Sequence, residues 1–154
     1  ERSHVLDVSA IPMPIAAPAT FQEYMEGGCE LRFCLAIDFT SSNGDPRIPG
    51  TLHHQDPNQF NDYEETISSI GASIEHYSDE CTVLGFGAKF NGVTQHVFQC
   101  GSQSSVQSVE GLMDAYKSMF QADLIMSGPT VFDPVLQFAA ARAKKFQSEV
   151  HNKN

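Results

Sequence analysis

The chain has 154 residues and a hydrophobic content of 41%, which is enough for one domain with a single core. Its formal net charge of -10 opposes binding to nucleic acid, because the phosphate backbone is also negative, and favours a metal cation as partner. No segment reaches the roughly 18 consecutive apolar residues of a membrane-spanning helix, and the first residues lack the pattern of a signal peptide.

The four cysteines indicate a reducing compartment. They form no CxxC motif, and two of them lie in apolar runs, where a free thiol packs as a small hydrophobic group. We therefore expect a cytoplasmic protein.

Residues 1–20 are predicted to be a linker. The segment Ser9–Thr20 contains three prolines and shows no helical period, which is typical of extended chain. A capping-box pattern follows in Thr20–Glu23, and Gly27–Gly28 supplies a stop, so a short helix is expected between them. The domain proper is expected to span residues 21–154.

Leu31–Ile37 is predicted to be the first strand, and its nearly continuous apolar character is typical of a central strand covered on both faces. A helix is predicted from Asp56–Pro57, where a capping carboxylate precedes proline. Apolar residues at intervals of three and four support this helix. They are Phe60, Tyr63, Ile67, Ile70, Ile74 and Tyr77.

A hairpin is predicted next. The segments "TVLGFGAKF" and "VTQHVF" flank Asn91–Gly92, a dipeptide typical of tight hairpin turns, so the two strands should be antiparallel. Gly85 and Gly87 leave room for another group to pack closely on the first of these strands.

Two further helices are predicted, one from about Ser105 to Phe120 and one that begins at Asp133–Pro134. The order of strand, helix, hairpin, helix and helix indicates an α/β fold, with helices placed to cover a sheet.

The loop after the first strand carries the strongest functional signal. In open α/β sheets the ligand crevice lies at the carboxyl ends of the strands, and "DFTSSN" occupies such a position. Asp38, Thr40 and Ser42 place carboxylate and hydroxyl oxygens at alternate positions, and these are hard ligands that suit Mg²⁺. The same residue types also form ordinary turns that cap a following helix, so the local pattern leaves both interpretations open.

A family resemblance favours the metal site. D-x-T-x-S after an apolar strand resembles the metal-ion-dependent adhesion site of von Willebrand factor A domains. The segments "DFTSSNGDP", "LGFGAKF", "VEGLMDAY" and "SGPTVFDPV" resemble the A domain of the copines, in the same order. The resemblance runs from about Phe21 to the end of the chain. It implies a Rossmann-like, von Willebrand A-type fold with a mostly parallel central sheet, one antiparallel edge hairpin and helices on both faces.

The resemblance also implies four metal ligands. Asp38, Thr40 and Ser42 would come from the first loop, and Thr130 in "SGPT" would supply a hydroxyl from a second loop. The cation would be Mg²⁺, or else Mn²⁺ or Ca²⁺. It would coordinate an acidic group of a partner protein at the face that carries the metal.

One family element is not found in the sequence, namely a strand that ends in an acidic "TDG"-like turn. We therefore expect the C-terminal part of the domain to be missing after Asn154, with water completing the metal site. In the family this strand pairs with the first one. Its absence predicts an exposed apolar edge at Leu31–Asp38. The hypothesis is that either the remainder of the domain exists in the full gene product or two copies of the chain pair through this edge.

A metal-dependent phosphate-handling enzyme is the alternative function. An aspartate at a strand end can accept a phosphoryl group, but dehalogenase-like sites carry a second acid two residues later, where this chain has Thr40. No general base or activated nucleophile stands at a suitable spacing, so a non-enzymatic binding module is preferred.

The histidines are predicted to be structural. His53 and His54 have no third ligand at a metal-binding spacing and are expected in a loop, at the rim of the site. His76 is expected at the end of a helix and His96 in the edge strand after the hairpin. Asp45 is expected to form a turn rather than to bind metal.

The resemblance further implies a longer parent protein with two C2 domains that bind phospholipid in the presence of calcium. Residues 1–8 would be the end of the second C2 domain. Recruitment to membranes would then depend on domains outside this chain. The negative charge of the present segment argues against its direct contact with anionic lipid.

Overall fold

The computed structural model describes residues 18–78 and 80–151 of the chain. Two compact units are present, one ending at Glu30 and the other beginning at Leu31. The first unit contains helix α1 (Phe21–Glu26). The linker predicted for residues 1–20 lies almost wholly outside the described residues.

Helix α1 has the predicted capping box. The backbone N–H of Thr20 donates to the carboxylate of Glu23 at 2.7 Å, and the backbone N–H of Glu23 donates to the hydroxyl of Thr20 at 3.3 Å. The helix ends before Gly27, as expected.

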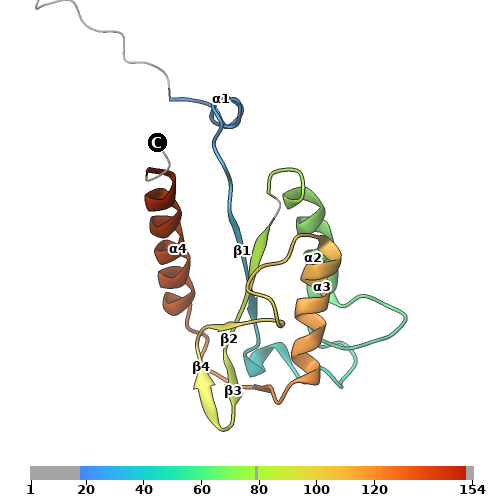
Figure 1. Cartoon of the computed structure of the whole chain (residues 1–154). Helices are drawn as coiled ribbons and strands as arrows, with labels where there is room; N and C mark the ends of the chain where they lie inside the picture. Colours follow the sequence, from blue (N-terminus) through green and yellow to red (C-terminus); the bar gives the residue numbers. More distant parts are fainter. Residues whose placement is uncertain (1–17, 79, 152–154) are drawn as a thin grey trace, which may run out of the picture. The chain divides into compact units, whose positions relative to one another are not determined.

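The second unit is a mixed α/β fold with two small sheets (Figure 1). One sheet has the strand order β1-β2-β5 and the other β4-β3-β6. In chain order the elements are β1 (Phe33–Asp38), the 3-10 helix η2 (Ser41–Asn43), α2 (Asp62–Ile74), β2 (Cys81–Phe86), β3 (Ala88–Phe90), β4 (Val93–Gln95), β5 (Phe98–Gln99), α3 (Val109–Ser118), the 3-10 helix η3 (Met119–Gln121), β6 (Ile125–Met126) and α4 (Asp133–His151).

The strand pairing differs from the mostly parallel sheet that the resemblance implies. Strands β1 and β2 are parallel, but the pairs β2–β5, β3–β4 and β3–β6 are antiparallel. The chain leaves the first sheet at Gly87, whose φ of 76° lies in the left-handed region that favours glycine. This bend divides the predicted strand "TVLGFGAKF" into β2 and β3, which belong to different sheets.

The predicted hairpin is confirmed between β3 and β4. Phe90 stands opposite Val93, and Asn91 and Gly92 have φ values of 50° and 78°, as a tight hairpin turn requires. His96 was predicted to lie in the edge strand after the hairpin. In the structure it lies beyond the end of β4, so that prediction is wrong.

Strand β1 is an edge strand within the described part of the chain, and the prediction of a central strand covered on both faces is wrong there. Among residues 18–78 and 80–151 it pairs with β2 alone, and Cys34 and Ala36 are exposed whereas Ile37 is buried. Within this described part of the chain, the edge expected at Leu31–Asp38 is therefore open along β1. The pairing of two copies through this edge stays a prediction.

Helix α2 begins at Asp62 and not at the predicted Asp56–Pro57. The carboxylate of Asp56 instead accepts the backbone N–H of Asn58 in a local turn, at 2.8 Å. Asn61 and Glu64 form a reciprocal capping box at the true helix start, with both bonds at 2.9 Å. The helix is capped at Asn61 because the capping box there satisfies two backbone N–H groups, whereas Asp56 before Pro57 would offer a single capping carboxylate.

Helix α3 also begins later than predicted. Its cap is Ser108, and Val106, which was assigned to the helix, instead exchanges two backbone hydrogen bonds with Cys81. The start of α4 at Asp133 is confirmed.

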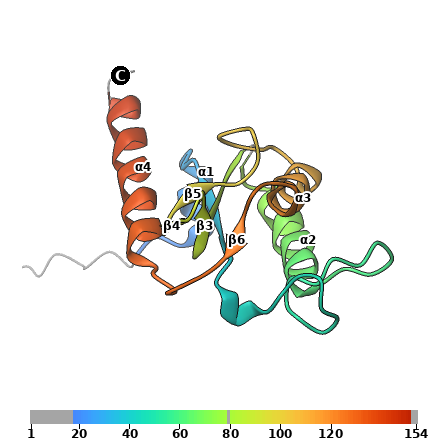
Figure 2. The same ribbon diagram turned by 90° about the horizontal axis from the view of Figure 1, so that it is seen from below.

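Helices lie on both sides of the first sheet, as expected (Figures 1 and 2). Helices α2 and α3 cover the side that holds most of the core, and α4 stands on the other side. There the rings of Phe132 and Phe86 lie 5.3 Å apart, and the guanidinium of Arg32 lies 5.1 Å from the ring of Phe146. Within residues 18–78 and 80–151, no helix is both long enough and apolar enough to cross a membrane.

Cys100 gives a stability prediction for this core. Its thiol is 0% exposed, and burial raises its pKa from 9.0 to about 12. The unfolded chain therefore loses this proton at a lower pH than the folded chain. The contribution of the Cys100 thiol to the free energy of unfolding is fully present below pH 9 and is lost as the pH rises toward 12. Between pH 8 and pH 11, the free energy of unfolding of the wild type should therefore decrease by about 3 kcal/mol more than that of Cys100→Ala.

Urea unfolding at the two pH values measures this decrease. Cys29→Ala is the matched control, because Cys29 is exposed. The prediction is contradicted if both variants lose stability with pH as the wild type does.

Candidate functional site

The predicted ligand loop lies directly after the end of β1. The backbone N–H of Phe39 donates to the carbonyl of Phe86 at 2.9 Å, which holds the loop against the end of β2. Thr40 then forms an isolated parallel bridge with Ser127. This bridge places the first loop beside the segment that leads to Thr130.

All four predicted ligands are brought together. The backbone N–H of Thr40 donates to the carboxylate of Asp38 at 2.8 Å. The hydroxyl of Thr130 donates to that of Thr40 at 3.2 Å, and the Thr40 and Ser42 hydroxyls are 3.0 Å apart. We call Asp38, Thr40, Ser42 and Thr130 the hydroxyl cluster. Its role as a metal site stays a prediction.

Gly87 makes room for this cluster, as predicted from the glycines of the second strand. A Cβ atom at Gly87 would overlap the methyl group of Thr40 and would lie 3.0 Å from its backbone nitrogen. The loop can therefore approach the bend between β2 and β3 only because residue 87 has no side chain.

His53 is the main residue that sequence reasoning misplaced. It was expected in a loop at the rim of the site, but its side chain is 0% exposed. Its Nε2 lies 2.8 Å from the carbonyl oxygen of Asp38, and its Nδ1 lies 2.9 Å from the hydroxyl of Tyr116. No local pattern identifies this role, because the two partners are 15 and 63 residues away in the sequence.

The protonation of His53 follows from its partners. A carbonyl oxygen only accepts, so Nε2 carries the proton, and Nδ1 is then free to accept from Tyr116. Burial lowers the pKa of His53, which keeps the ring neutral, and burial raises the pKa of Tyr116, which keeps its hydroxyl a donor.

Two more side chains bind the same carbonyl group of Asp38. The side-chain amide of Asn43 donates to it at 2.7 Å, and the hydroxyl of Tyr63 donates at 3.2 Å. Burial raises the pKa of Tyr63 to about 12, so this hydroxyl also stays protonated. Three side chains therefore converge on the backbone of the only acidic member of the cluster.

Asp45 forms a turn, as predicted. Its carboxylate accepts the backbone N–H of Arg47 at 2.9 Å and the guanidinium at 2.6 Å, and the side-chain bond lowers the pKa of Asp45 to about 2. His54 lines a separate surface hollow. Neither residue joins the cluster.

A groove of about 710 Å³ opens beside the hydroxyl cluster. Part of its lining comes from Ser41, which lies between Thr40 and Ser42 in the loop. The groove has apolar walls from η3, β6 and the segment between them, and a polar rim from the first loop. The apolar residues are Phe120, Leu124, Ile125 and Met126, and the rim includes Asp45, Arg47 and Gln55.

The chemistry of the cluster fits a hard divalent cation. One carboxylate and three hydroxyls supply oxygen donors only, and Mg²⁺ binds through a few protein oxygens while it keeps several waters. Among the described residues, no group of three or more His, Cys, Asp or Glu side chains could hold a metal ion. A cation at this position would therefore depend on hydroxyl oxygens as well as on Asp38.

Comparison with known proteins identifies the family. The family model "Copine" matches residues 51–153. The chain belongs to the copine family. This copine segment is 36% identical to Copine-B and 33% identical to Copine-E of Dictyostelium discoideum, over 80% and 85% of its length. It is 40% identical to Protein BONZAI 1 of Arabidopsis thaliana, over 79% of its length.

The copine segment spans only 22% to 24% of the length of these curated relatives. The family model includes Thr130 and begins after the loop of Asp38, Thr40 and Ser42. The names of the relatives describe no enzymatic reaction.

The close approach at Gly87 gives a prediction with a matched control. Gly92 has a similar φ of 78°, but a Cβ atom there would meet nothing within 4 Å. Gly92→Ala should therefore cost about 1–2 kcal/mol through backbone strain alone. Gly87→Ala should cost at least about 1 kcal/mol more, because it also displaces Thr40. Urea unfolding of both variants tests this, and equal losses would show that Thr40 does not need the space.

Proposed function

We propose that this copine segment is a metal-dependent protein-interaction module. A divalent cation, Mg²⁺ or else Mn²⁺ or Ca²⁺, is held by Asp38, Thr40, Ser42 and Thr130, and an acidic group of a partner protein completes its coordination. The observation that carries the proposal is the contact between the two loops, in which the Thr130 hydroxyl lies 3.2 Å from that of Thr40.

The contact supports the proposal because it gathers oxygen atoms from two loops at one point, as the coordination of a hard divalent cation requires. Thr130 and Thr40 are 90 residues apart, and their side chains meet beside a carboxylate at the carboxyl end of a strand. A bound cation would supply positive charge in a chain whose net charge is -10, and so would allow an acidic partner to approach.

The groove beside Ser41 supports a protein as the partner. A partner segment with an acidic side chain at the hydroxyl cluster would place its neighbouring residues over apolar walls that include Leu124, Ile125 and Met126. Ile125 is 62% exposed and so is available for such a contact. An acidic residue next to an apolar one is therefore the proposed form of the partner sequence.

For the whole protein we propose a cytoplasmic location with calcium-dependent recruitment to phospholipid membranes. The membrane contact would be made by C2 domains outside this chain, and the segment would recruit protein partners rather than nucleic acid.

Calorimetric titration with Mg²⁺ and Mn²⁺ tests the site. The wild-type chain should show saturable binding at one site. Asp38→Asn removes the charge but keeps an oxygen that can accept from Thr40, and Thr130→Val removes only a hydroxyl. Each should weaken binding by roughly tenfold or more.

Thr66→Val is the matched control for the hydroxyl. Thr66 is exposed on α2, and its hydroxyl donates to the carbonyl of Asp62, far from the cluster in the sequence. It should bind both cations as the wild type does. Absence of binding to the wild-type chain, or equal binding by all four proteins, would refute the proposed site.

A further inference from the structure

His53 contacts the candidate metal loop from the inside of the protein, where its side chain is 0% exposed. We propose that His53 is a positioning residue, which fixes the backbone of Asp38 and so presents the carboxylate and the following hydroxyls in one arrangement. The expected effect of His53 on metal binding rests on the proposed function, whereas the effect of His53 on the loop is independent of any metal.

The contact is made at the point that controls the loop. The Asp38 carbonyl, which accepts from His53 at 2.8 Å, belongs to the peptide group that joins Asp38 to Phe39. The orientation of this peptide determines where the next backbone N–H groups point. The N–H of Thr40 donates to the Asp38 carboxylate, so rotation of the peptide would break the turn that holds the cluster together.

The imidazole itself cannot turn. Its ring stacks on Tyr63, with centroids 4.0 Å apart and planes inclined by 17°. The ring of Phe39 stacks at 5.2 Å and 10°. A flat ring held in this way keeps its two nitrogen atoms directed at the Asp38 carbonyl and the Tyr116 hydroxyl.

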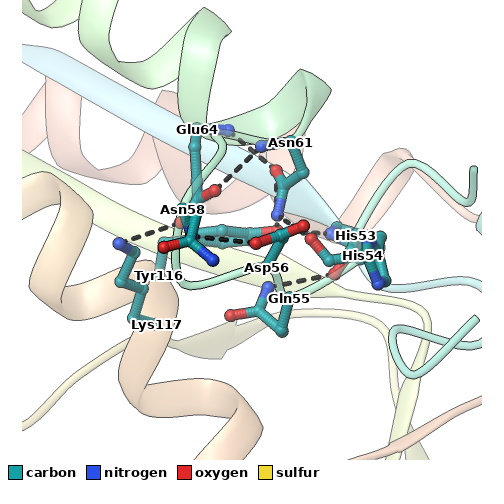
Figure 3. Close-up of polar contacts among 9 residues, drawn as sticks. All are labelled: His53, His54, Gln55, Asp56, Asn58, Asn61, Glu64, Tyr116 and Lys117. Atoms are coloured by element: carbon teal, nitrogen blue, oxygen red, sulfur yellow. Dashed lines mark hydrogen bonds and ion pairs between the residues drawn. The ribbon is translucent and has the colours of Figure 1, made fainter. Parts of the chain in front are cut away.

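Tyr116 joins His53 to the helix pair α2–α3 (Figure 3). The Tyr116 hydroxyl also lies 3.4 Å from Asn61, which caps α2. Next to this cap, the carboxylate of Glu64 pairs with the ammonium of Lys117 on α3 at 2.9 Å, and the Glu64 side chain is only 4% exposed. The loop is therefore supported by two helices that are fixed to each other.

Histidine suits this position because it is a planar ring with a donor on one nitrogen and an acceptor on the other. Phenylalanine would keep the stacking on Tyr63 and lose both hydrogen bonds. Tyr116→Phe would remove only the hydroxyl that orients the ring. The two variants thus separate the hydrogen bonds of His53 from its packing.

The first experiment needs no metal. Amide hydrogen exchange is measured by NMR on the full chain without divalent cations. In His53→Phe, the amides of Thr40 and Ser41 should exchange at least tenfold faster, because the loop is released. Those of Cys81 and Cys100, which donate to Val106 and Val83 in the core, should keep their wild-type rates.

The matched control for this experiment is His96→Phe. His53 is fully buried and His96 is partly buried, but the Nδ1 of His96 makes no hydrogen bond, so the same substitution breaks no bond at that nitrogen. In His96→Phe, the amides of Thr40 and Ser41 should exchange at wild-type rates. Tyr116→Phe should change the Thr40 and Ser41 rates in the same direction as His53→Phe, by a smaller factor.

The second experiment measures Mn²⁺ affinity by calorimetry. His53→Phe should weaken it by roughly 10- to 100-fold, the usual effect of losing a group that orients a ligand. His53→Gln offers an amide donor to the Asp38 carbonyl and should restore part of the loss. His96→Phe should bind as the wild type does.

The outcomes separate the two proposals. If the wild-type chain binds no cation, the proposed function fails, and the exchange rates alone decide whether His53 holds the loop. The inference is overturned if the Thr40 and Ser41 amides exchange at wild-type rates in His53→Phe, or if all amides, including those of Cys81 and Cys100, exchange faster together. Unchanged Mn²⁺ affinity in His53→Phe, with a wild type that binds, also overturns it.

Discussion

The backbone carbonyl of Asp38 is the point on which the candidate site depends. It lies where β1 ends, and it accepts hydrogen bonds from Asn43, His53 and Tyr63 instead of from a neighbouring strand. These bonds stop the strand and turn the chain into the loop that carries the hydroxyls. Because all three donors are side chains, the direction of the loop is determined by packing from η2, α2 and the segment between them.

The second loop reaches the first because of the way the sheets divide. The parallel pair β1–β2 places the end of β1 beside Gly87, where the chain turns into the second sheet. Strand β6 pairs with β3 in that sheet, and the residue after it, Ser127, forms a bridge with Thr40. Thr130 follows three residues later and contacts the hydroxyl of Thr40. The topology of this copine domain thus brings together groups that are far apart in the sequence.

Features with a short-range cause were predictable from the sequence. The cap at Thr20, the turn at Asn91–Gly92 and the start of α4 depend on residues next to one another in the chain. The three residues of the "DFTSS" loop were found from their position after an apolar strand. Thr130 was found only through the copine resemblance, because no local pattern links it to a loop 90 residues earlier.

The features that the sequence did not predict depend on competition between two helix caps or on contacts between residues far apart in the chain. Two cap sequences lie five residues apart before α2, one at Asp56 and one at Asn61, and the reciprocal bonds of Asn61 and Glu64 decide between them. The role of His53 requires Asp38 and Tyr116, which only the folded chain brings close. The division of the predicted strand at Gly87 follows from its positive φ, which a glycine permits but does not by itself indicate.

The central claim is that a cation binds at the hydroxyl cluster, and the position of bound Mn²⁺ tests it most directly. Because Mn²⁺ is paramagnetic, it broadens the NMR signals of amides that lie near it. During titration of the full chain, the amides of Thr40, Ser42 and Thr130 should broaden first and together. Earlier broadening at the acidic surface hollow lined by Asp56, Asp62 and Glu65, or no selective broadening at all, would contradict the claim.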